Sequence, residues 1–425
     1  MLFDELNLNK KLLEAIKLCN YTKTTPIQNE IIPHILKNRD VQAIAPTGSG
    51  KTASFVLPIL HNILKKNEKH PYIKALIIAP TKELAVQINQ SIIKYAQKTN
   101  IKSFVIYGGT KIQTDINNLQ NHIDILVCTS GRLAQHLKDK TVNLNNVEFL
   151  VLDEADTLLE MGFINEINLT LETIPSESQI SLFSATMGTS IKKLSDKILR
   201  KKVCVNIDKE QKATHKINQK VYFLSKEEKV DLVSFLIGKN YKDRFIVFTR
   251  TKHTAKIVYE KLKEAGLNCL NLHGNMTQNA RLKSIADFKK NKAQVLVATD
   301  ITARGIDIEA LECVINYDIP NSVDDYVHRI GRTGRAGRNG DAISFVSPSE
   351  VYSLRVIERK LQFKMTEVFE DGFGKDIADD IKAPKIIVRK DEKRKTKGAY
   401  GAKKTDQKRK KLKGKRSGWN IHDDR

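Results

Sequence analysis

Short runs of apolar, often β-branched residues alternate with longer amphipathic stretches over most of the 425-residue chain. The short runs have the length of strands, whereas stretches such as 82–98 and 254–265 have the character of helices. Runs that are apolar at every position, such as 75–79, suit strands covered by helices on both faces. The alternation therefore predicts parallel sheets in α/β domains. The predicted strands are 41–45, 75–79, 103–107, 125–128, 149–152 and 180–184, followed by 221–224, 245–249, 269–272, 295–298, 313–317 and 342–346.

Residues 208–220 separate the two sets of strands and are polar, charged and nearly free of large apolar residues. A chain of this length exceeds what one hydrophobic core usually serves, so we place a domain boundary there. Beyond about Ala383 the apolar pattern ends in Lys- and Arg-rich sequence, which we expect to be disordered when unbound. The expected fold is two α/β domains in tandem with a cleft between them and a basic C-terminal tail. The expected boundaries are 1–29 for an N-terminal segment, 30–207 for the first domain, 208–220 for a linker, 221–370 for the second domain and 371–425 for the tail.

The chain is strongly basic, with a formal net charge of +23 and a pI near 9.6. From Lys385 to Arg425 there are 17 Lys and Arg against 5 Asp and Glu, and the rest of the chain is basic as well. An excess of positive charge of this size favours a polyanionic partner, either nucleic acid or an anionic membrane surface. No apolar run approaches about 18 residues, so we expect no membrane span and favour nucleic acid.

Five cysteines are scattered along the chain without a Cys-x-x-Cys pair. Their odd number and their spacing argue against a disulfide framework and against a zinc site. Such thiols usually act as small apolar residues in a reducing compartment. Because the first residues show no secretory signal either, we expect a cytoplasmic protein without a membrane partner.

The segment Ala45-Pro46-Thr47-Gly48-Ser49-Gly50-Lys51-Thr52 lies between a predicted strand and an apolar, helix-like run. Such a loop offers successive backbone N–H groups and a helix N-terminus to phosphate oxygens. Its glycines allow a sharp turn, Lys51 would reach the β- and γ-phosphates, and Thr52 would bind Mg²⁺. The pattern normally begins with Gly, so Ala45 is a small departure. A Gly- and Ser-containing turn that happens to precede a lysine is the alternative interpretation.

A phosphate-binding loop also requires an acidic residue at the tip of a neighbouring strand to hold the metal. Asp153-Glu154-Ala155-Asp156 follows the predicted strand 149–152 directly. We expect Asp153 to hold Mg²⁺, and Glu154 to polarise the attacking water and accept its proton. Acidic residues after a strand also cap the next helix, and Asp156 could do so.

Transfer of the γ-phosphoryl group further needs positive charge in the transition state. His328-Arg329-Ile330-Gly331-Arg332-Thr333-Gly334-Arg335 offers three arginines, and it lies in the second predicted domain. An ordinary solvated loop is the alternative. Arginines supplied by the second domain would make hydrolysis depend on closure of the cleft.

These segments, in this order and spacing, resemble the DEAD-box family of ATP-dependent RNA helicases over about residues 1–350. The resemblance implies two RecA-like domains, ATP and Mg²⁺ as cofactors, and RNA bound without sequence preference as single strand or short duplex. The segments 248–252 and 273–275 are most similar to those of bacterial helicases of the RhlE type.

The family pattern also implies roles for individual residues. ATP contacts outside the phosphate loop are implied for Phe3, Gln28, Gly305 and Asp307. The implied arginine fingers are Arg332 and Arg335, which complete a catalytic set with Lys51, Asp153 and Glu154. Coupling of hydrolysis to strand separation is implied for Asp156, Ser184, Thr186 and His328. RNA contacts are implied for Thr81, Lys82, Gly109, Thr129, Arg132, Thr251, Gly274, Gln278, Arg281, Thr299 and Arg304.

The chain departs from the usual family pattern at Asn20, Thr24, Lys82, Ser130 and Thr302. Lys82 stands where Arg is usual, and a lysine meets a phosphate as a point charge without the bidentate fork. The departure at Lys82 bears on RNA affinity, whereas the positions implied for hydrolysis are intact.

The expected function is therefore that of an ATP-dependent RNA helicase, which couples ATP hydrolysis to local duplex unwinding or to remodelling of RNA–protein particles. An alternative is an ATP-switched RNA clamp or chaperone whose basic tail supplies most RNA binding. A DNA translocase of the same architecture shares the phosphate chemistry, but the family motifs favour RNA. Ribosome assembly and RNA decay are both compatible with such an enzyme, so proteins of either machinery are candidate partners of an expected monomer.

Overall fold

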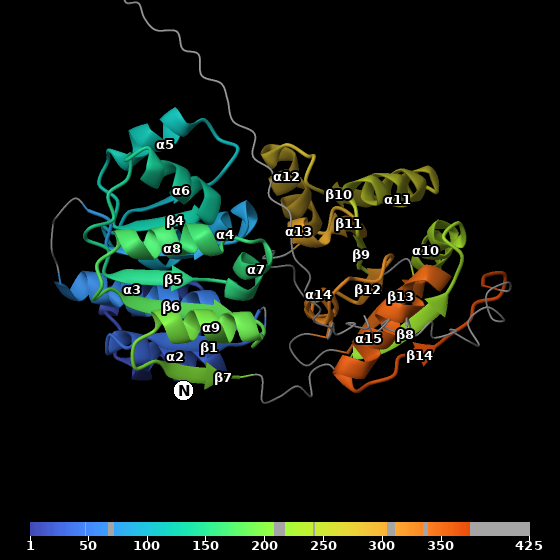
Figure 1. Cartoon of the computed structure of the whole chain (residues 1–425), viewed down its shortest axis with the longest axis horizontal. Coiled ribbons are helices and arrows are strands. Elements are labelled where there is room, and N and C mark those ends of the chain that lie inside the picture. Colours follow the sequence, from blue (N-terminus) through green and yellow to red (C-terminus); the bar gives the residue numbers. More distant parts are fainter. Residues whose placement is uncertain are drawn as a thin grey trace, which may run out of the picture. The chain divides into compact units, whose positions relative to one another are not determined.

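The computed structural model describes residues 1–46, 48–66, 72–207, 217–240, 243–303, 311–334 and 339–374. These residues form two α/β domains, each built around a seven-stranded parallel sheet (Figure 1). The predicted fold class is thereby confirmed. Residues 375–425, most of the predicted tail, lie outside the described residues.

The first sheet has the strand order β3-β4-β2-β5-β6-β1-β7. Its strands are β1 (Val41–Ile44), β2 (Ala75–Ala79), β3 (Ser103–Ile106), β4 (Ile125–Thr129), β5 (Phe149–Leu152), β6 (Gln179–Ser184) and β7 (Val203–Asn206). Every residue of β1, β2, β4, β5 and β6 is buried, as expected for strands that are covered on both faces.

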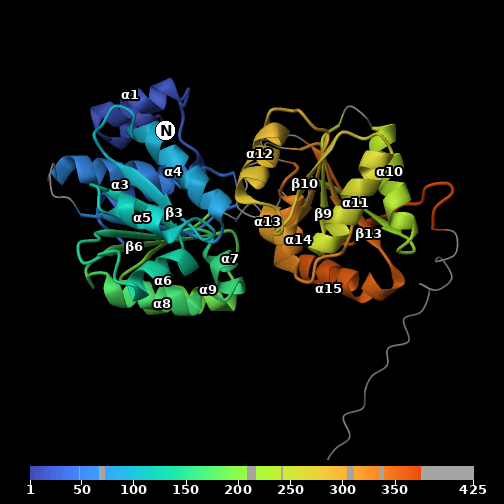
Figure 2. The ribbon, with the colours of Figure 1, turned by 90° about the horizontal axis from the view of Figure 1, so that it is seen from above.

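Alternate residues of these strands belong to two cores, because successive side chains of a strand point to opposite faces. Ile77 and Val151 lie in one core, and their neighbours Ile78 and Leu152 lie in the other. Figure 2 shows the helices on either side of this sheet. Those packed on the first core are α1 (Lys10–Leu18), α2 (Pro26–Leu36), α3 (Lys51–Lys66) and α4 (Lys82–Ala96). Those packed on the second are α6 (Ser130–Lys138), α7 (Ala155–Glu160), α8 (Ile164–Thr173) and α9 (Thr189–Ile198), and α5 spans Ile112–Leu119.

The second sheet has the strand order β10-β11-β9-β12-β13-β8-β14. Its strands are β8 (Ile217–Phe223), β9 (Phe245–Thr249), β10 (Cys269–Leu272), β11 (Val295–Thr299), β12 (Cys313–Asn316), β13 (Gly340–Val346) and β14 (Thr366–Glu367). One face is covered by α10 (Glu228–Lys239) and α11 (Lys252–Glu264). The other is covered by α12 (Gln278–Lys289), α14 (Val323–Ile330) and α15 (Val351–Leu361), with the short helices α13 (Asp300–Ala303) and η3 (Pro348–Glu350) nearby in the chain. None of the helices in the described ranges is long and apolar enough to cross a membrane.

The two sheets repeat one topology. If the strands of each sheet are numbered from one to seven along the chain, both have the order 3-4-2-5-6-1-7. In parallel α/β sheets, ligands bind at the carboxyl ends of the strands. Each sheet therefore offers two neighbouring groups of loops, one after strands 3, 4 and 2 and the other after strands 5, 6 and 1.

The structure differs from the sequence prediction at strand ends. β8 begins at Ile217, so residues 217–220 belong to the second sheet and not to the predicted linker 208–220. Its burial pattern alternates at the start, since Asn218 is exposed while Gln219 is buried, and the polar residues there hide the strand. The edge strands β7 and β14 were not predicted, because both are short and partly exposed.

Candidate active site

The predicted phosphate loop joins the carboxyl end of β1 to the amino end of α3. Gly48 and Gly50 have positive φ angles of 80° and 95°, a region that favours glycine. A Cβ atom on Gly50 would also lie 2.5 Å from Gln28 Nε2, so a larger residue does not fit there. Thr47 lies outside the described residues. The described residues of the loop are Ala45, Pro46, Gly48, Ser49 and Gly50.

Lys51 is the first residue of α3, and its side chain is buried. Its Nζ donates a hydrogen bond to Ala45 O at 2.6 Å. Lys51 and Thr52 line a cleft of about 520 Å³ together with Asp153 and Glu154. The loop thus presents an ammonium group, a hydroxyl group and a helix N-terminus to one cleft, which are the parts of a phosphate site.

Asp153 and Glu154 follow β5 directly, with 2% and 7% of their surfaces exposed. Glu154 donates its backbone N–H to Asp153 Oδ1 at 2.9 Å and has a positive φ of 48°. Burial raises the pKa of Asp153 to about 6, although the charge of Lys51 acts in the opposite direction. Burial, followed by the charge of Asp153, raises the pKa of Glu154 to about 7. Neighbouring carboxyl groups with raised pKa values are typical of sites that bind a cation or transfer a proton.

The residues predicted to couple hydrolysis to strand separation lie together. Asp156 Oδ2 accepts hydrogen bonds from the backbone N–H groups of Ala185 and Thr186, both at 3.0 Å. The Ser184 hydroxyl donates to Thr186 O at 2.7 Å. His328 Nε2 lies 3.9 Å from the same Asp156 oxygen. This arrangement connects the acidic segment after β5 with the segment after β6.

The predicted adenine contacts border the same cleft. Gln28 Oε1 accepts the Thr25 N–H at 3.0 Å, and Gln28 Nε2 donates to Gly50 O at 3.2 Å. Phe3, in η1 (Phe3–Leu6), is buried, and its ring stacks on that of Tyr21 with centroids 6.4 Å apart. Tyr21 is thus a further aromatic residue at this end of the cleft, and the sequence analysis assigned it no role.

Arg332 also lines the cleft, although it belongs to the second domain. Its side chain is buried, and its positive charge lowers the pKa of Glu154 against the larger effect of burial. Lys289, at the end of α12, is a second cation that the second domain contributes to the cleft, and it was not predicted. Besides Thr47, four more predicted residues lie outside the described residues: Arg304, Gly305, Asp307 and Arg335.

The predicted RNA contacts of the first domain lie at the carboxyl ends of β2, β3 and β4. Thr81 caps α4, and its hydroxyl accepts the Leu84 N–H at 3.3 Å. Gly109 has a positive φ of 94°, and a Cβ atom there would lie 2.9 Å from Lys82 Nζ. Thr129 ends β4 and is buried. The amine of Lys82 and the glycine loop are therefore adjacent, although they are far apart in sequence.

Arg132, predicted to bind RNA, is buried and bonded within the first domain. Its Nε donates to Asp115 Oδ2 at 2.6 Å, and one terminal nitrogen donates to both oxygens of Thr110, at 2.6 and 2.9 Å. Thr110 follows Gly109 directly, so Arg132 fixes the glycine loop from behind. Asp115 is a buried partner that the sequence analysis missed.

In the second domain, the predicted RNA contacts lie after β9, β10 and β11. Thr251 caps α11 and accepts the Thr254 N–H at 3.0 Å, and Gly274 has open space on its Cβ side. The Thr299 hydroxyl is 2.9 Å from that of Thr302, which lies 2.8 Å from Leu272 O. The unusual Thr302 therefore ties the segment after β11 to the segment after β10.

Arg281 of α12 forms an ion pair with Glu83 of α4, with its terminal nitrogen 2.9 Å from Glu83 Oε1. Glu83 is almost fully buried and was not predicted as a functional residue. In the sequence, Glu83 is simply an acidic residue next to Lys82, and nothing there indicates that it pairs with Arg281. Of Gln278, predicted to bind RNA beside Arg281, only the helical backbone is described.

Asp153 and Thr52 fit a Mg²⁺ site of the kind that substrate phosphates and water complete. Both line the cleft. Asp153, Glu154 and Asp156 are all buried and interact with the charge of Lys51, and a divalent cation would balance the charge of their carboxylates. Within the described ranges, no group of three or more His, Cys, Asp or Glu side chains is placed to hold a metal ion. The protein would therefore supply few of the ligands.

Family models match both domains. Residues 25–194 match the model described as DEAD/DEAH box helicase, and residues 228–337 match the helicase conserved C-terminal domain. The chain is 41% identical over 365 residues to the ATP-dependent RNA helicase CshA of Limosilactobacillus reuteri, which covers 86% of this chain and 73% of the relative. It is 40% identical over 368 residues to the DEAD-box ATP-dependent RNA helicase RhpA of Helicobacter pylori, which covers 87% of this chain and 74% of the relative. The narrower RhlE-type assignment stays a prediction.

Solved structures match over the same length. S. cerevisiae Dbp5 bound to RNA and ADP BeF3 superposes with a TM-score of 0.78 at 32% identity, over 86% of this chain and 95% of that chain. The DEAD-box helicase Mss116 bound to ssRNA and UDP-BeF superposes with a TM-score of 0.79 at 28% identity, over 87% of this chain and 80% of that chain. The relatives found by sequence and the solved structures found by superposition thus include DEAD-box helicases in both cases.

Proposed function

This chain belongs to the DEAD-box family of ATP-dependent RNA helicases, and we propose that it binds and hydrolyses ATP in the cleft lined by Lys51, Asp153 and Glu154. The observation that supports this assignment most directly is the composition of the cleft. The phosphate loop, both buried carboxyl groups and Arg332 all line it. Phosphoryl transfer needs each of these parts.

Binding of ATP would use groups that already surround the cleft. The backbone of the phosphate loop and the N-terminus of α3 would hold the phosphates, and Lys51 would exchange Ala45 O for the β- and γ-phosphates. Mg²⁺ held by Asp153 and Thr52 would neutralise phosphate charge and orient the γ-phosphate. The amide of Gln28 would read the adenine edge, and Phe3 would pack against the base.

Hydrolysis would use Glu154 as the base. It is buried in the cleft, and its raised pKa suits a group that accepts a proton from water. Arg332 would stabilise the charge on the transferred phosphoryl group, a contribution of about 10³ to 10⁵ in rate for arginine fingers. Because Arg332 comes from the second domain, hydrolysis would depend on the position of that domain. By family resemblance Arg335 shares this role.

RNA would be bound by the loops after β2, β3 and β4 and by those after β9, β10 and β11. The groups there are hydroxyls, backbone atoms and the cations Lys82 and Arg281, and Arg281 would exchange Glu83 for RNA. Such groups suit phosphate and 2′-hydroxyl contacts rather than base edges. Binding would therefore be insensitive to sequence. The bonds between Asp156 and the 185–186 segment would relay the state of the ATP site to the rest of the domain.

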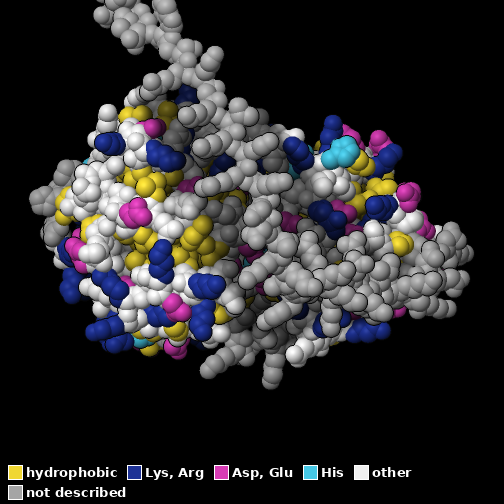
Figure 3. All heavy atoms as spheres, viewed as in Figure 1, with side chains coloured by type: hydrophobic (Ala, Val, Ile, Leu, Met, Phe, Trp, Pro, Cys, Tyr) yellow, Lys and Arg dark blue, Asp and Glu magenta, His cyan; other side chains and the backbone are white. Residues whose placement is uncertain are grey.

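The basic tail favours a second candidate, an ATP-switched RNA clamp in which the tail supplies most RNA binding. On the face drawn in Figure 3, the Lys and Arg side chains of the described residues are scattered among Asp and Glu. In contrast, residues 385–425 concentrate 17 Lys and Arg against 5 Asp and Glu. Such a segment binds RNA non-specifically and with a steep dependence on salt.

Release of a labelled strand from a short RNA duplex separates the two candidates. The helicase releases the strand only when ATP is present and is hydrolysed. A clamp binds the duplex in the presence of ATP and releases no strand. Strand release that is equally fast without ATP would contradict the helicase assignment.

A further inference from the structure

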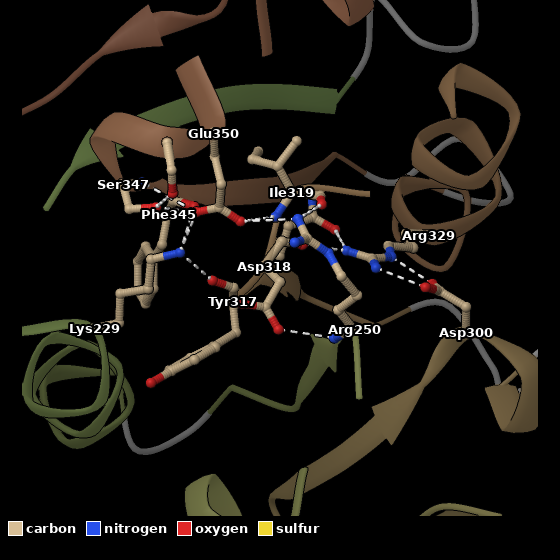
Figure 4. A network of polar contacts seen from close by, with 12 residues as sticks. Lys229, Arg250, Asp300, Tyr317, Asp318, Ile319, Arg329, Phe345, Ser347 and Glu350 are labelled. Atoms are coloured by element: carbon tan, nitrogen blue, oxygen red, sulfur yellow. Dashed lines mark hydrogen bonds and ion pairs between the residues drawn. The ribbon is translucent and has the colours of Figure 1, made fainter. Parts of the chain in front are cut away.

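A partly buried network of charged side chains lies at the carboxyl ends of β9, β12 and β13 in the second domain (Figure 4). At its centre is Glu350, which has only 6% of its surface exposed. Its carboxylate accepts bonds from Lys229 Nζ at 2.6 Å and from a terminal nitrogen of Arg250 at 3.1 Å. It also accepts the Ile319 N–H at 3.2 Å and both the N–H and the hydroxyl of Ser347, at 3.1 and 2.7 Å. Two donors therefore meet Glu350 Oε1 and three meet Oε2.

The network occupies the place in the second sheet that corresponds to the ATP cleft of the first. β12 and β13 are the counterparts of β5 and β6, and β8 is the counterpart of β1. Lys229 lies in the first turn of α10, which follows β8, just as Lys51 begins the helix that follows β1. Both lysines are buried and point their amines at backbone carbonyls. In the second domain, the carboxylate of Glu350 forms an ion pair with Lys229 and neutralises its charge.

Arg250 connects this network to the turn that leads into α11. Its backbone N–H donates to Asp318 Oδ2 at 2.8 Å, and its guanidinium donates to Ile319 O at 2.8 Å as well as to Glu350. The next residue, Thr251, caps α11 and is a predicted RNA contact. The RNA-facing turn after β9 is therefore bonded at three points to residues 318, 319 and 350.

Arg329, at the opposite end of the network, is hydrogen-bonded to the same 318–319 turn. One of its terminal nitrogens donates to Asp318 O at 2.6 Å, and the other donates to Asp300 Oδ2 at 2.7 Å. Asp300 follows Thr299, a second predicted RNA contact. Arg332 lies just beyond the end of α14, and its backbone N–H donates to Arg329 O at 3.1 Å. In Figure 4, Lys229 and Glu350 lie at one end of the network and Asp300 at the other, with Arg250 between them.

We propose that Arg250 is a positioning residue that couples the RNA-facing turn after β9 to the segment carrying Arg332. RNA bound at Thr251 fixes the turn after β9. The hydrogen bonds of Arg250 then fix the 318–319 turn relative to it, and Arg329 bonds that turn to α14. The turn after α14 that carries Arg332 is then held in one orientation. The inference rests on the proposed function, because it assumes that Thr251 meets RNA and that Arg332 serves hydrolysis.

The test replaces Arg250 by Met and by Lys in the full-length chain. Arg250 is 42% exposed at its side chain, and without it Glu350 keeps Lys229, Ile319 and Ser347 as partners, so the variants should fold. Lysine retains a charge that can reach Glu350 but lacks the fork that also bonds Ile319 O. The matched control is Arg355→Met on α15, because Arg355 is 37% exposed and pairs with Glu358 away from the 318–319 turn.

Steady-state ATPase assays at varied RNA concentration give kcat and the KM for RNA. We expect Arg250→Met to lower kcat at saturating RNA by about 10-fold to 100-fold and to raise the KM for RNA, as a small misplacement of a catalytic group does. Arg250→Lys should recover part of the loss, and ATP affinity without RNA should stay that of the wild type. Arg355→Met should leave kcat and the KM for RNA unchanged.

Two results separate failure of this inference from failure of the proposed function. If Arg250→Met matches Arg355→Met in kcat and in the KM for RNA while the wild type is stimulated by RNA, the positioning role is wrong. A fall in melting temperature with unchanged kinetic constants at lower temperature contradicts it too, since the residue would then be merely structural. If RNA does not stimulate the wild type at all, the proposed function itself fails.

Discussion

The carboxylate of Asp156 accepts hydrogen bonds from both the backbone N–H and the hydroxyl of Thr186, at 3.0 and 3.1 Å. Burial acts to raise the pKa of Asp156, but the charges of His328 and Lys51, with hydrogen bonds, outweigh burial and hold this pKa below its ordinary value. The carboxylate is therefore ionised at neutral pH. Asp156 lies two residues after the proposed base Glu154, so the two bonds link the hydrolysis site to the segment after β6.

Replacing Thr186 by Val removes the hydroxyl donor and keeps the backbone donor. We expect this variant to retain most of its RNA-stimulated ATPase rate and to lose duplex unwinding by about 10-fold, because the link and not the chemistry is weakened. Both rates are measured on the same duplex. The control is Thr173→Val in α8, whose hydroxyl donates to Leu169 O of its own helix. Equal losses of ATPase and unwinding would show that Thr186 serves hydrolysis itself.

Replacing Glu154 by Gln removes the proposed base while its shape is kept. Hydrolysis should fall by about 10²-fold to 10⁴-fold, the usual contribution of a positioned base. ATP-dependent RNA binding, followed by fluorescence anisotropy, should remain measurable, because the phosphates are held by other groups. Asp196→Asn, an exposed carboxylate on α9, serves as the control. Undiminished hydrolysis by the Gln variant would falsify the assignment of the base.

Replacing Gly50 by Ala should weaken ATP binding. The new Cβ would lie 2.5 Å from Gln28 Nε2 and 2.9 Å from Thr25 Oγ1, and φ at this position is +95°. The loop or the side chain of Gln28 must shift, and both are proposed to contact ATP. We expect affinity for a fluorescent ATP analogue to fall by at least about 10-fold. Gly238→Ala in α10, where a Cβ meets nothing within 4 Å, should bind the analogue like the wild type.

Replacing Glu350 by Gln should change how stability depends on pH. Burial acts to raise the pKa of Glu350, but Lys229 and the bonds from Ser347 outweigh it and hold the pKa below the ordinary 4.5. A carboxylate with a depressed folded-state pKa adds stability that is present above 4.5 and is lost as pH falls through the folded-state pKa. At about pH 7 the variant should be less stable by about 3–5 kcal/mol, because Lys229 keeps its charge without a charged partner.

The measurement is urea unfolding of the second domain at about pH 7 and about pH 4. The stability gap between wild type and Glu350→Gln should narrow at the lower pH. Glu260→Gln, in an exposed pair on α11, should show no gap at either pH. A gap for Glu350→Gln that is the same at both pH values would contradict the depressed pKa.

Deleting residues 385–425 removes 17 Lys and Arg and 5 Asp and Glu. If the tail binds RNA, affinity should fall, and the slope of log Kd against log salt should become shallower by about 0.7 for each lost phosphate contact on a single strand. RNA affinity at several salt concentrations checks this. The same affinity and slope in both chains would show that the tail is a passive extension.

Much of the site could be predicted because its chemistry needs particular residues at particular spacings. A phosphate loop requires glycines before a lysine, and Gly48, Gly50 and Lys51 show that pattern. Runs that are apolar at every position, such as 75–79, indicated buried parallel strands, because a strand covered on both faces needs apolar side chains on both. In contrast, partners such as Glu83, Asp115 and Glu350 could not be found, since a buried carboxylate is defined by the cation that folding brings to it. The shared strand order of the two sheets was also hidden, because no repeat of residues accompanies it.

The central claim is that RNA activates hydrolysis at a site that includes Arg332. The ATPase rate of the wild type and of Arg332→Ala, each measured without nucleic acid, with single-stranded RNA and with DNA of the same sequence, tests it most directly. We expect RNA to stimulate the wild type while DNA does not, and we expect Arg332→Ala to lose about 10³-fold or more of the stimulated rate. A wild-type rate that does not depend on RNA, or an Arg332→Ala variant that RNA still activates fully, would contradict the account.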